Sequence, residues 1–160
     1  MKPLGIILIV LCIAAFAGVI YVYAVSSLSV SYMDCIATDP VTQLDFFNAM
    51  KAQLLDGTFV GTRFSDAEIA SPDQLLYYTW TVRLNNATFL TADAAEIQIV
   101  PMSGDILQIG DPSEHTVPSG RSLELSATVL TSRSMHSIRE AIVTWYFWGL
   151  PFSARVTLGR

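Results

Sequence analysis

The sequence has few of the residues on which metal sites and most enzymes depend. Its 160 residues include only two cysteines and two histidines. Zinc sites use three or four ligands, mostly Cys and His at short spacings, and no such pattern occurs. There is also no glycine-rich phosphate loop, dinucleotide fingerprint or nucleophile elbow. We therefore expect no catalytic residues, no metal and no cofactor. The alternative is an enzyme on the same scaffold, and it would require a dense acidic or His-lined pocket.

Positive charge is also scarce. The formal net charge is −5, from 14 acidic and nine basic residues. Lys2 is the only charged residue before Asp34, so nearly all the charge belongs to the rest of the chain. An acidic surface repels polyanions, and we therefore expect no nucleic-acid partner.

The first 25 residues contain a long uncharged run. Leu4 to Val25 is free of charge, and as a helix it would be about 33 Å long, enough to cross a hydrocarbon core of about 30 Å. This pattern predicts a transmembrane signal-anchor helix at residues 1–25, with the lipid bilayer as a partner through Leu4–Val25. Lys2 favours a cytoplasmic amino terminus, so we expect a single-pass protein of the cell membrane with residues 26–160 outside.

A cleaved signal peptide is the alternative, because Val22-Tyr23-Ala24 resembles a cleavage site. The apolar part of signal peptides is about 7–15 residues, shorter than this run, which favours the anchor. In both cases residues 26–160 leave the cytoplasm. Cys35 is then a lone thiol outside the membrane, either a small buried apolar side chain or half of an intermolecular disulfide.

Beyond residue 26, apolar and polar residues alternate with a period of two in most segments. Turn residues recur every 8–12 residues, which favours an antiparallel sandwich over βαβ units. Asp39–Leu55 instead has helical spacing, with Asp39 as cap and Gly57 as stop. We therefore predict a mainly β fold, an antiparallel β-sandwich of the immunoglobulin or fibronectin kind with one accessory helix. The expected strands are 27–32, Thr58–Phe64, Leu75–Leu84, Ala95–Ile99, Ile106–Gly110, Leu123–Val129, Ala141–Trp148 and Phe152–Leu158. We expect Met102–Asp105 to form a hairpin turn and Ser132–Arg139 a short helical turn.

Strands and turns follow a recognisable order between Thr79 and Thr131. The motifs are Val82-Arg83-Leu84-Asn85-Asn86, Ala95-Glu96-Ile97-Gln98-Ile99, Ser103-Gly104-Asp105 and Val117-Pro118-Ser119-Gly120-Arg121-Ser122-Leu123. This order resembles the late-embryogenesis-abundant type-2 family, also called the water-stress and hypersensitive-response domain. Tyr146–Leu158 is similar to that family's final hairpin. The resemblance implies a non-catalytic sandwich linked to desiccation stress or membranes, in several members with one amino-terminal anchor.

The densest aromatic run is Trp145-Tyr146-Phe147-Trp148. In a strand, Trp145 and Phe147 point to one face, and Tyr146 and Trp148 point to the other. One face must be core. We expect the helix at Asp39–Leu55 to cover Tyr146 and Trp148; the alternative is an exposed interaction surface that binds a partner or touches lipid headgroups.

Three polar positions are candidate sites. Asn86-Ala87-Thr88 is an acceptor sequence for N-glycosylation at a strand end. His115 lies beside Asp111 in a predicted loop, where solvated loop residues are favoured over a metal site. His136 lies near Arg133 and Arg139, where we expect a surface ion cluster and not a catalytic base.

The sequence therefore predicts a membrane-anchored, extracytoplasmic, non-catalytic domain. Its expected role is structural or interaction-based in the cell envelope, and stress-related if the family resemblance holds. The alternative is a dedicated subunit of a larger envelope assembly, such as a secretion or surface-filament machine, with an envelope protein as partner.

Overall fold

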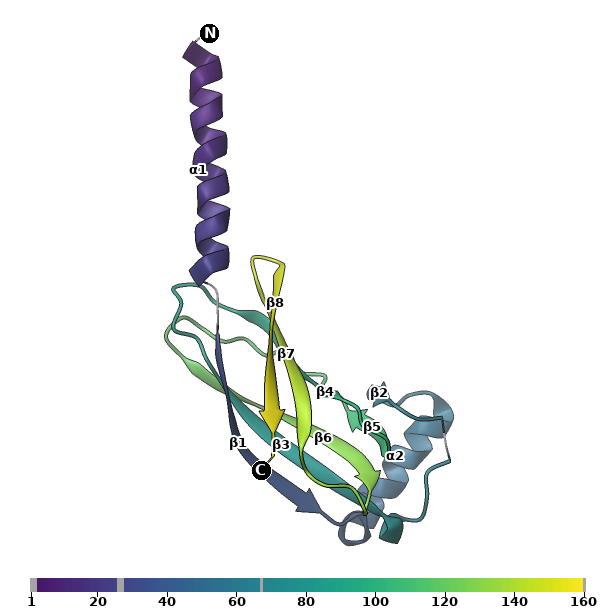
Figure 1. The fold of residues 1–160 in the computed structure, drawn as a ribbon. Helices are drawn as coiled ribbons and strands as arrows, with labels where there is room; N and C mark the ends of the chain where they lie inside the picture. The colour runs from purple at the N-terminus through teal and green to yellow at the C-terminus, as the bar shows by residue number, and fades with distance from the viewer. Residues whose placement is uncertain (1–2, 26–27, 67, 160) are drawn as a thin grey trace.

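The computed structural model describes residues 3–25, 28–66 and 68–159 (Figure 1). In these ranges the strands form two antiparallel sheets, one in the order β1-β3-β6-β5-β2 and one in the order β4-β7-β8. The strands are β1 (Ser29–Thr38), β2 (Gly61–Arg63), β3 (Leu75–Asn85), β4 (Asp93–Val100), β5 (Asp105–Ile109), β6 (Ser122–Ser132), β7 (Arg139–Phe147) and β8 (Leu150–Leu158). The predicted mainly β, antiparallel sandwich with an accessory helix is confirmed.

The main core lies between the two sheets. β3 shows why the sequence folds this way, because its alternate residues Trp80, Val82 and Leu84 are fully buried. β7 supplies the facing layer with Val143, Trp145 and other alternate residues. Each large apolar side chain buried in this way contributes about 1.5–3 kcal/mol. The period-two pattern of the sequence is thus the pattern of the core.

A second, smaller core lies on the outer face of the larger sheet, under α2 (Leu44–Asp56). Asp39 caps the preceding 3-10 turn η1 (Pro40–Gln43), where its Oδ1 accepts a hydrogen bond from the Val41 amide at 3.0 Å. Gly57 ends α2 in the left-handed conformation, with φ 71°. Phe47 and Met50 of α2 are buried against strand residues. The 3-10 turn η2 (Pro72–Gln74) then leads into β3.

The amino-terminal helix α1 (Pro3–Val25) extends away from the sandwich (Figure 1). Its described large apolar side chains are all more than half exposed. Within the described residues, no helix is long and apolar enough to cross a membrane. Lys2, on which the predicted orientation depends, lies outside the described residues, and so do the side chains of Val22, Tyr23 and Ala24.

Three local predictions are wrong. Met102–Asp105 makes a turn, with Asp105 N–H donating to Met102 O at 3.0 Å, but the strands on either side belong to different sheets. The turn therefore crosses the sandwich and does not close a hairpin. The strand at Thr58–Phe64 shortens to β2, and Ser132–Arg139 contains a turn but no helix.

Candidate functional site

The tip of the β7–β8 hairpin combines exposure with an unusual backbone. Phe147 pairs with Leu150, so Trp148 and Gly149 form a two-residue turn. Both have positive φ, 51° for Trp148 and 77° for Gly149, which is typical of a type I′ turn. Asn, Asp or Gly is preferred at the first position, because bulky side chains are strained at positive φ. A tryptophan at this position is therefore a conformational outlier.

The aromatic run divides between core and surface. Trp145 and Phe147 are buried in the main core, whereas Trp148 is 70% exposed and Tyr146 is 39% exposed. The prediction that α2 covers Tyr146 and Trp148 is wrong. α2 packs on the outer face of the larger sheet, because Leu75, Tyr77, Leu107 and Leu130 form an apolar surface there. Tyr146 and Trp148 thus stay on the surface.

The hairpin tip lies at the same end of the sandwich as the base of α1, while α2 lies at the opposite end (Figure 1). We call these the proximal and distal ends. Phe89, in the β3–β4 loop, belongs to the proximal end, since its ring stacks on Tyr21 of α1 with centroids 6.4 Å apart. Phe89 is 58% exposed. Two segments distant in sequence therefore present exposed aromatic rings at the end of the sandwich that carries α1.

Asn86 ties the proximal loops together from a buried position. Its Nδ2 donates to Leu90 O at 2.7 Å and to Val117 O at 2.8 Å. Its Oδ1 accepts hydrogen bonds from the amide and the hydroxyl of Thr88. In the folded domain, the nitrogen that a glycan would occupy is buried and donates two hydrogen bonds. The structure thus gives Asn86 a structural role.

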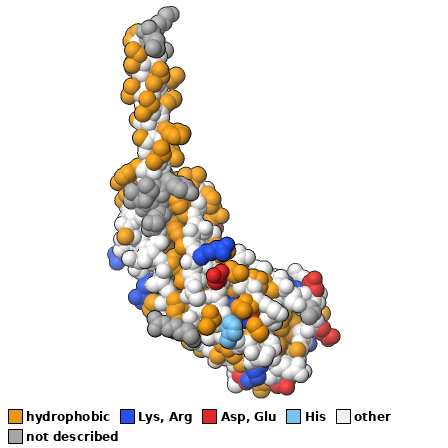
Figure 2. Space-filling view, viewed as in Figure 1, with side chains coloured by type: hydrophobic (Ala, Val, Ile, Leu, Met, Phe, Trp, Pro, Cys, Tyr) orange, Lys and Arg blue, Asp and Glu red, His pale blue; other side chains and the backbone are white. Residues whose placement is uncertain are grey.

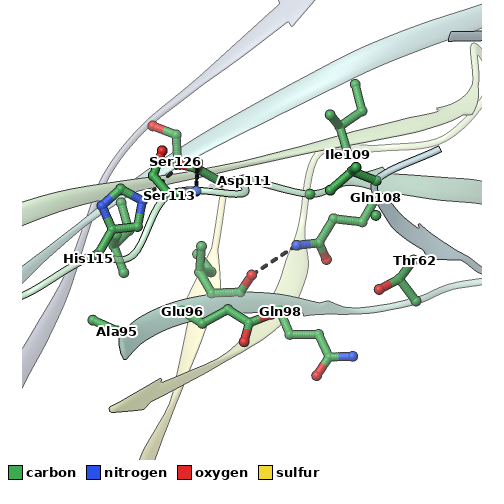
Figure 3. Close-up of a pocket in the computed structure, with 15 residues that line it drawn as sticks. Thr62, Ala95, Glu96, Gln98, Gln108, Ile109, Asp111, Ser113, His115 and Ser126 are labelled. Atoms are coloured by element: carbon green, nitrogen blue, oxygen red, sulfur yellow. Dashed lines mark hydrogen bonds and ion pairs between the residues drawn. The ribbon is translucent and has the colours of Figure 1, made fainter. Parts of the chain in front are cut away.

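A polar hollow of about 270 Å³ lies at one open side of the sandwich, between β4 and the β2–β5 edge (Figure 3). Asp111, Ser113 and His115 line one wall, and Glu96 and Gln98 of β4 lie opposite. His115 Nε2 is 2.8 Å from Asp111 Oδ2. The Ser113 amide and then His115 hydrogen-bond to Asp111, which lowers the pKa of its carboxyl to about 2.

The hollow brings together residues that the sequence placed in one loop, yet its described contacts are structural. A Ser-His-Asp site needs a hydroxyl hydrogen-bonded to the imidazole. Here the Ser113 amide donates to Asp111, and the Ser126 hydroxyl bonds to that of Thr81 at 3.2 Å. Over the ranges that the structure describes, no three His, Cys, Asp or Glu side chains are close enough to hold a metal ion.

Gln108 closes the free edge of β4. Its side chain is buried between the sheets, where Nε2 donates to Ile97 O at 2.9 Å and Oε1 accepts from the Ile99 amide at 2.8 Å. The Ala95 amide donates to His115 O at 2.8 Å just beyond. A side-chain amide and a loop carbonyl therefore make hydrogen bonds to β4 that a neighbouring strand would otherwise make.

The predicted surface ion cluster around His136 does not form. Arg139 is only 1% exposed and makes a bidentate pair with Asp105, with Nη2 2.7 Å from Oδ1 and Nε 2.9 Å from Oδ2. Its Nη1 donates to His136 O and Ile138 O. The guanidinium thus links β7 of one sheet to β5 of the other.

Cys35 packs partly buried against the main core. Burial, and then the neighbouring charge of Asp34, raise the pKa of its thiol. The thiol is thus less readily ionised, which agrees with the interpretation of Cys35 as a small apolar side chain.

Sequence reasoning missed Asp105, Gln108 and Arg139 as buried polar groups. Asp105 was assigned to a turn and Arg139 to the surface, and their partnership spans 34 residues of chain. Of these three residues, only Gln108 could have been recognised from its neighbours in the sequence. Gln108 lies between apolar residues in a short strand, where an inward polar side chain needs hydrogen-bonding partners.

Comparison with known proteins gives no family. No protein-family model matches the chain, and no curated protein is similar to it. Among solved structures, a FixG-related protein from Vibrio parahaemolyticus is similar with 10% identity and a TM-score of 0.35, covering 59% of this chain and 87% of that chain. The cupredoxin domain of amoB from Nitrosocaldus yellowstonii is similar with 14% identity and a TM-score of 0.32, covering 82% and 87%. The resemblance of Thr79–Thr131 to the late-embryogenesis-abundant type-2 family stays a prediction.

Proposed function

We propose that the protein is a membrane-anchored domain of the cell envelope, with a non-catalytic, structural or interaction role outside the cytoplasm. The observation that carries this proposal is α1. Its described side chains from Gly5 to Tyr21 are apolar or small, and the large ones are exposed on all sides. In the full sequence the uncharged run continues from Leu4 to Val25. Such a helix gains free energy only by burial in lipid or against another protein.

The surface charges support the same arrangement. Figure 2 shows hydrophobic side chains along α1, and none of the acidic side chains visible on this face lies beside that helix. α1 ends at Val25 and β1 begins at Ser29, so the sandwich would stay close to the bilayer. An orientation with the domain outside follows from Lys2 in the sequence.

The finer fold assignment is also part of the proposal. Without the short β2, the strand order is β1-β3-β6-β5 in one sheet and β4-β7-β8 in the other. This is the ABED and CFG order of an immunoglobulin constant-type domain, and it supports an immunoglobulin-like sandwich. Domains of this architecture act mostly through their surfaces, and a stress-related role would follow from the family resemblance.

The anchor is tested by placing a charge in it. An arginine at the centre of a membrane helix costs about 2.5–3.5 kcal/mol on insertion scales. We expect Leu11→Arg, combined with Phe16→Arg, to release the full chain from membranes on alkaline extraction. The matched control is Leu55→Arg, since Leu55 is 82% exposed on α2 and lies outside the proposed anchor. Equal extraction of the wild type and the double variant would contradict the anchor.

Sidedness needs a separate measurement. Protease added to intact cells would degrade residues 26–160 if the domain is outside, whereas a cytoplasmic domain would be protected until the cells are opened. Protection in intact cells would contradict the proposed topology and leave the anchor standing.

A second candidate function is a subunit of a larger envelope assembly. It is favoured by a group of exposed apolar side chains at the distal end, which includes Phe46, Leu55 and Val60. Exposed apolar patches mark interaction surfaces. A photo-crosslinker at Phe46 in native membranes would capture one stoichiometric protein if the chain is such a subunit. If no protein is captured above background, the assembly subunit is contradicted and the first proposal, an autonomous domain, stands.

A further inference from the structure

We propose that the β7–β8 hairpin tip, with Trp148 at its point and Leu150 beside it, inserts into the interfacial zone of the same bilayer that holds α1. This inference rests on the proposed anchor and adds a second membrane contact. The hairpin tip and the base of α1 lie at the same end of the sandwich (Figure 1).

The composition of the hairpin suits an interface of lipid and water. No charged residue occurs from Ala141 to Ala154. The flanking charges, Glu140 and Arg155, form an exposed pair 3.7 Å apart at the distal half of the hairpin. Lipid interfaces favour tryptophan, whose ring is apolar with one polar N–H, and disfavour charge at depth.

The backbone at Trp148 indicates that its side chain serves something other than folding. Positive φ in a bulky residue strains the backbone. The side chain offsets little of this strain within the domain, because it is 70% exposed. By contrast, Trp80 and Trp145 are buried in the main core. Insertion of Trp148 into an interface would offset the strain.

Phe89 extends the same contact toward α1. Its ring stacks on Tyr21, and both rings remain more than half exposed. Tyr21 lies near the carboxyl end of α1, where a spanning helix reaches the interface. Aromatic rings on α1, on the β3–β4 loop and on the hairpin tip would then meet one interface. Contacts at several points would fix the tilt of the sandwich relative to the bilayer.

The exposure pattern gives a direct experiment. Trp148 is the only tryptophan of the chain that is not buried, so lipid quenching of tryptophan emission reports mainly on it. The full chain is reconstituted in phosphatidylcholine vesicles whose acyl chains are brominated near the headgroup. We expect the brominated lipids to quench the tryptophan emission of the wild type. The emission maximum should be blue-shifted relative to that of the denatured chain in buffer. In Trp148→Asn the quenching should be lost.

The variants keep folding separate from lipid contact. Trp148→Asn creates Asn-Gly, the preferred type I′ sequence, so the hairpin is retained. As a matched control, Leu55→Trp is added to Trp148→Asn, which moves the exposed tryptophan to the distal end. We expect no quenching there. Near-ultraviolet circular dichroism checks that both variants keep the packed core.

The outcomes are distinguishable. If the chain resists alkaline extraction but Trp148 shows no quenching, or as much as the distal control, the inference is overturned and the anchor stands. If a photo-crosslinker placed at Trp148 captures a protein in native membranes, and Trp148 emission is not quenched in vesicles, the hairpin tip contacts a protein. The inference is then overturned. A chain that leaves the vesicles on extraction overturns the anchor and the insertion together.

Discussion

The two ends of the sandwich are held together by different chemistry. At the distal end, loops and strands are fixed by ion pairs, Asp105 with Arg139 in the interior and Asp39 with Arg133 at the surface. At the proximal end, an exposed ion pair joins Arg83 to Glu124, but the buried groups that fix the loops are neutral amides and hydroxyls, chiefly those of Asn86 and Thr88. Charge is costly near hydrocarbon, whereas satisfied neutral groups are tolerated. The buried polar groups of the proximal end are thus neutral, whereas those of the distal end include a charged pair.

The distal ion pair should have the largest effect on stability. Arg139→Met leaves the Asp105 carboxylate buried without its partner, and we expect the free energy of unfolding to fall by about 3–5 kcal/mol. Urea unfolding of the full chain in mild detergent, followed by tryptophan fluorescence, measures this change. Arg139→Met with Asp105→Leu should lose less than Arg139→Met alone, because no unpaired charge remains. A double variant as unstable as the single one would show that packing, and not charge pairing, dominates at this end.

The neutral network of the proximal end should matter less. Asn86→Ala removes the donor to Val117 O and Leu90 O and the acceptor of the Thr88 amide, which we expect to cost about 1–3 kcal/mol. The same urea titration gives the value. Asn85→Ala is the matched control, since Asn85 is exposed and its neighbour is not. A similar loss in both variants would contradict the special role of the buried amide.

At the hairpin tip we expect a substitution to change stability in the opposite direction. Trp148→Asn relieves the strain of a bulky side chain at positive φ and should leave stability unchanged or raise it by about 1 kcal/mol in detergent. The measurement is the midpoint of thermal unfolding, with Tyr146→Asn as a control that keeps the strained turn. A marked destabilisation by Trp148→Asn would mean that the side chain packs within the domain, which would weaken the comparison of the two ends.

The smallest effect belongs to the polar hollow and depends on pH. The Ser113 amide and His115 hold the pKa of Asp111 at about 2, below its ordinary value of 3.8. A lowered folded-state pKa means that the contribution of Asp111 is present above pH 3.8 and is lost as the pH falls toward 2. An NMR titration of the Asp111 carboxyl should give a midpoint of about 2 in the wild type and a higher one in His115→Ala. Equal midpoints would assign the whole lowering of the Asp111 pKa to the hydrogen bonds of Ser113.

The sequence predicted what depends on local periodicity. The alternation from Leu75 to Leu84 located β3, and Asp39 with Gly57 delimited the helical region, because caps and patterns are encoded within a few residues. The placement of that helix was wrong, since nothing local in Asp39–Leu55 specifies which sheet face lies opposite. The choice was decided by Leu107 and Leu130, which come from distant strands.

For the hairpin tip, too, the sequence predicted the local pattern but not the long-range arrangement. The alternation in Trp145–Trp148 correctly assigned Trp145 and Phe147 to the core. The turn at Trp148-Gly149 was not predicted, because the expected strands Ala141–Trp148 and Phe152–Leu158 place it one residue later. Its position at the same end of the sandwich as α1 was not predicted either, because it depends on the order of the strands in the two sheets. The Asp105–Arg139 pair was missed for the same reason, as its two halves come from different sheets.

The closure of β4 by Gln108 has a consequence for crowding. Proteins confined to one surface meet their copies at high local concentration, and unpaired strand edges then seed aggregation. Each edge strand of this sandwich carries an obstacle to such pairing. β4 is already hydrogen-bonded by Gln108, β2 has three residues, β1 shifts register before Asp34, and β8 contains Pro151. The edge strands of the domain thus resist edge-to-edge pairing with other copies of the chain.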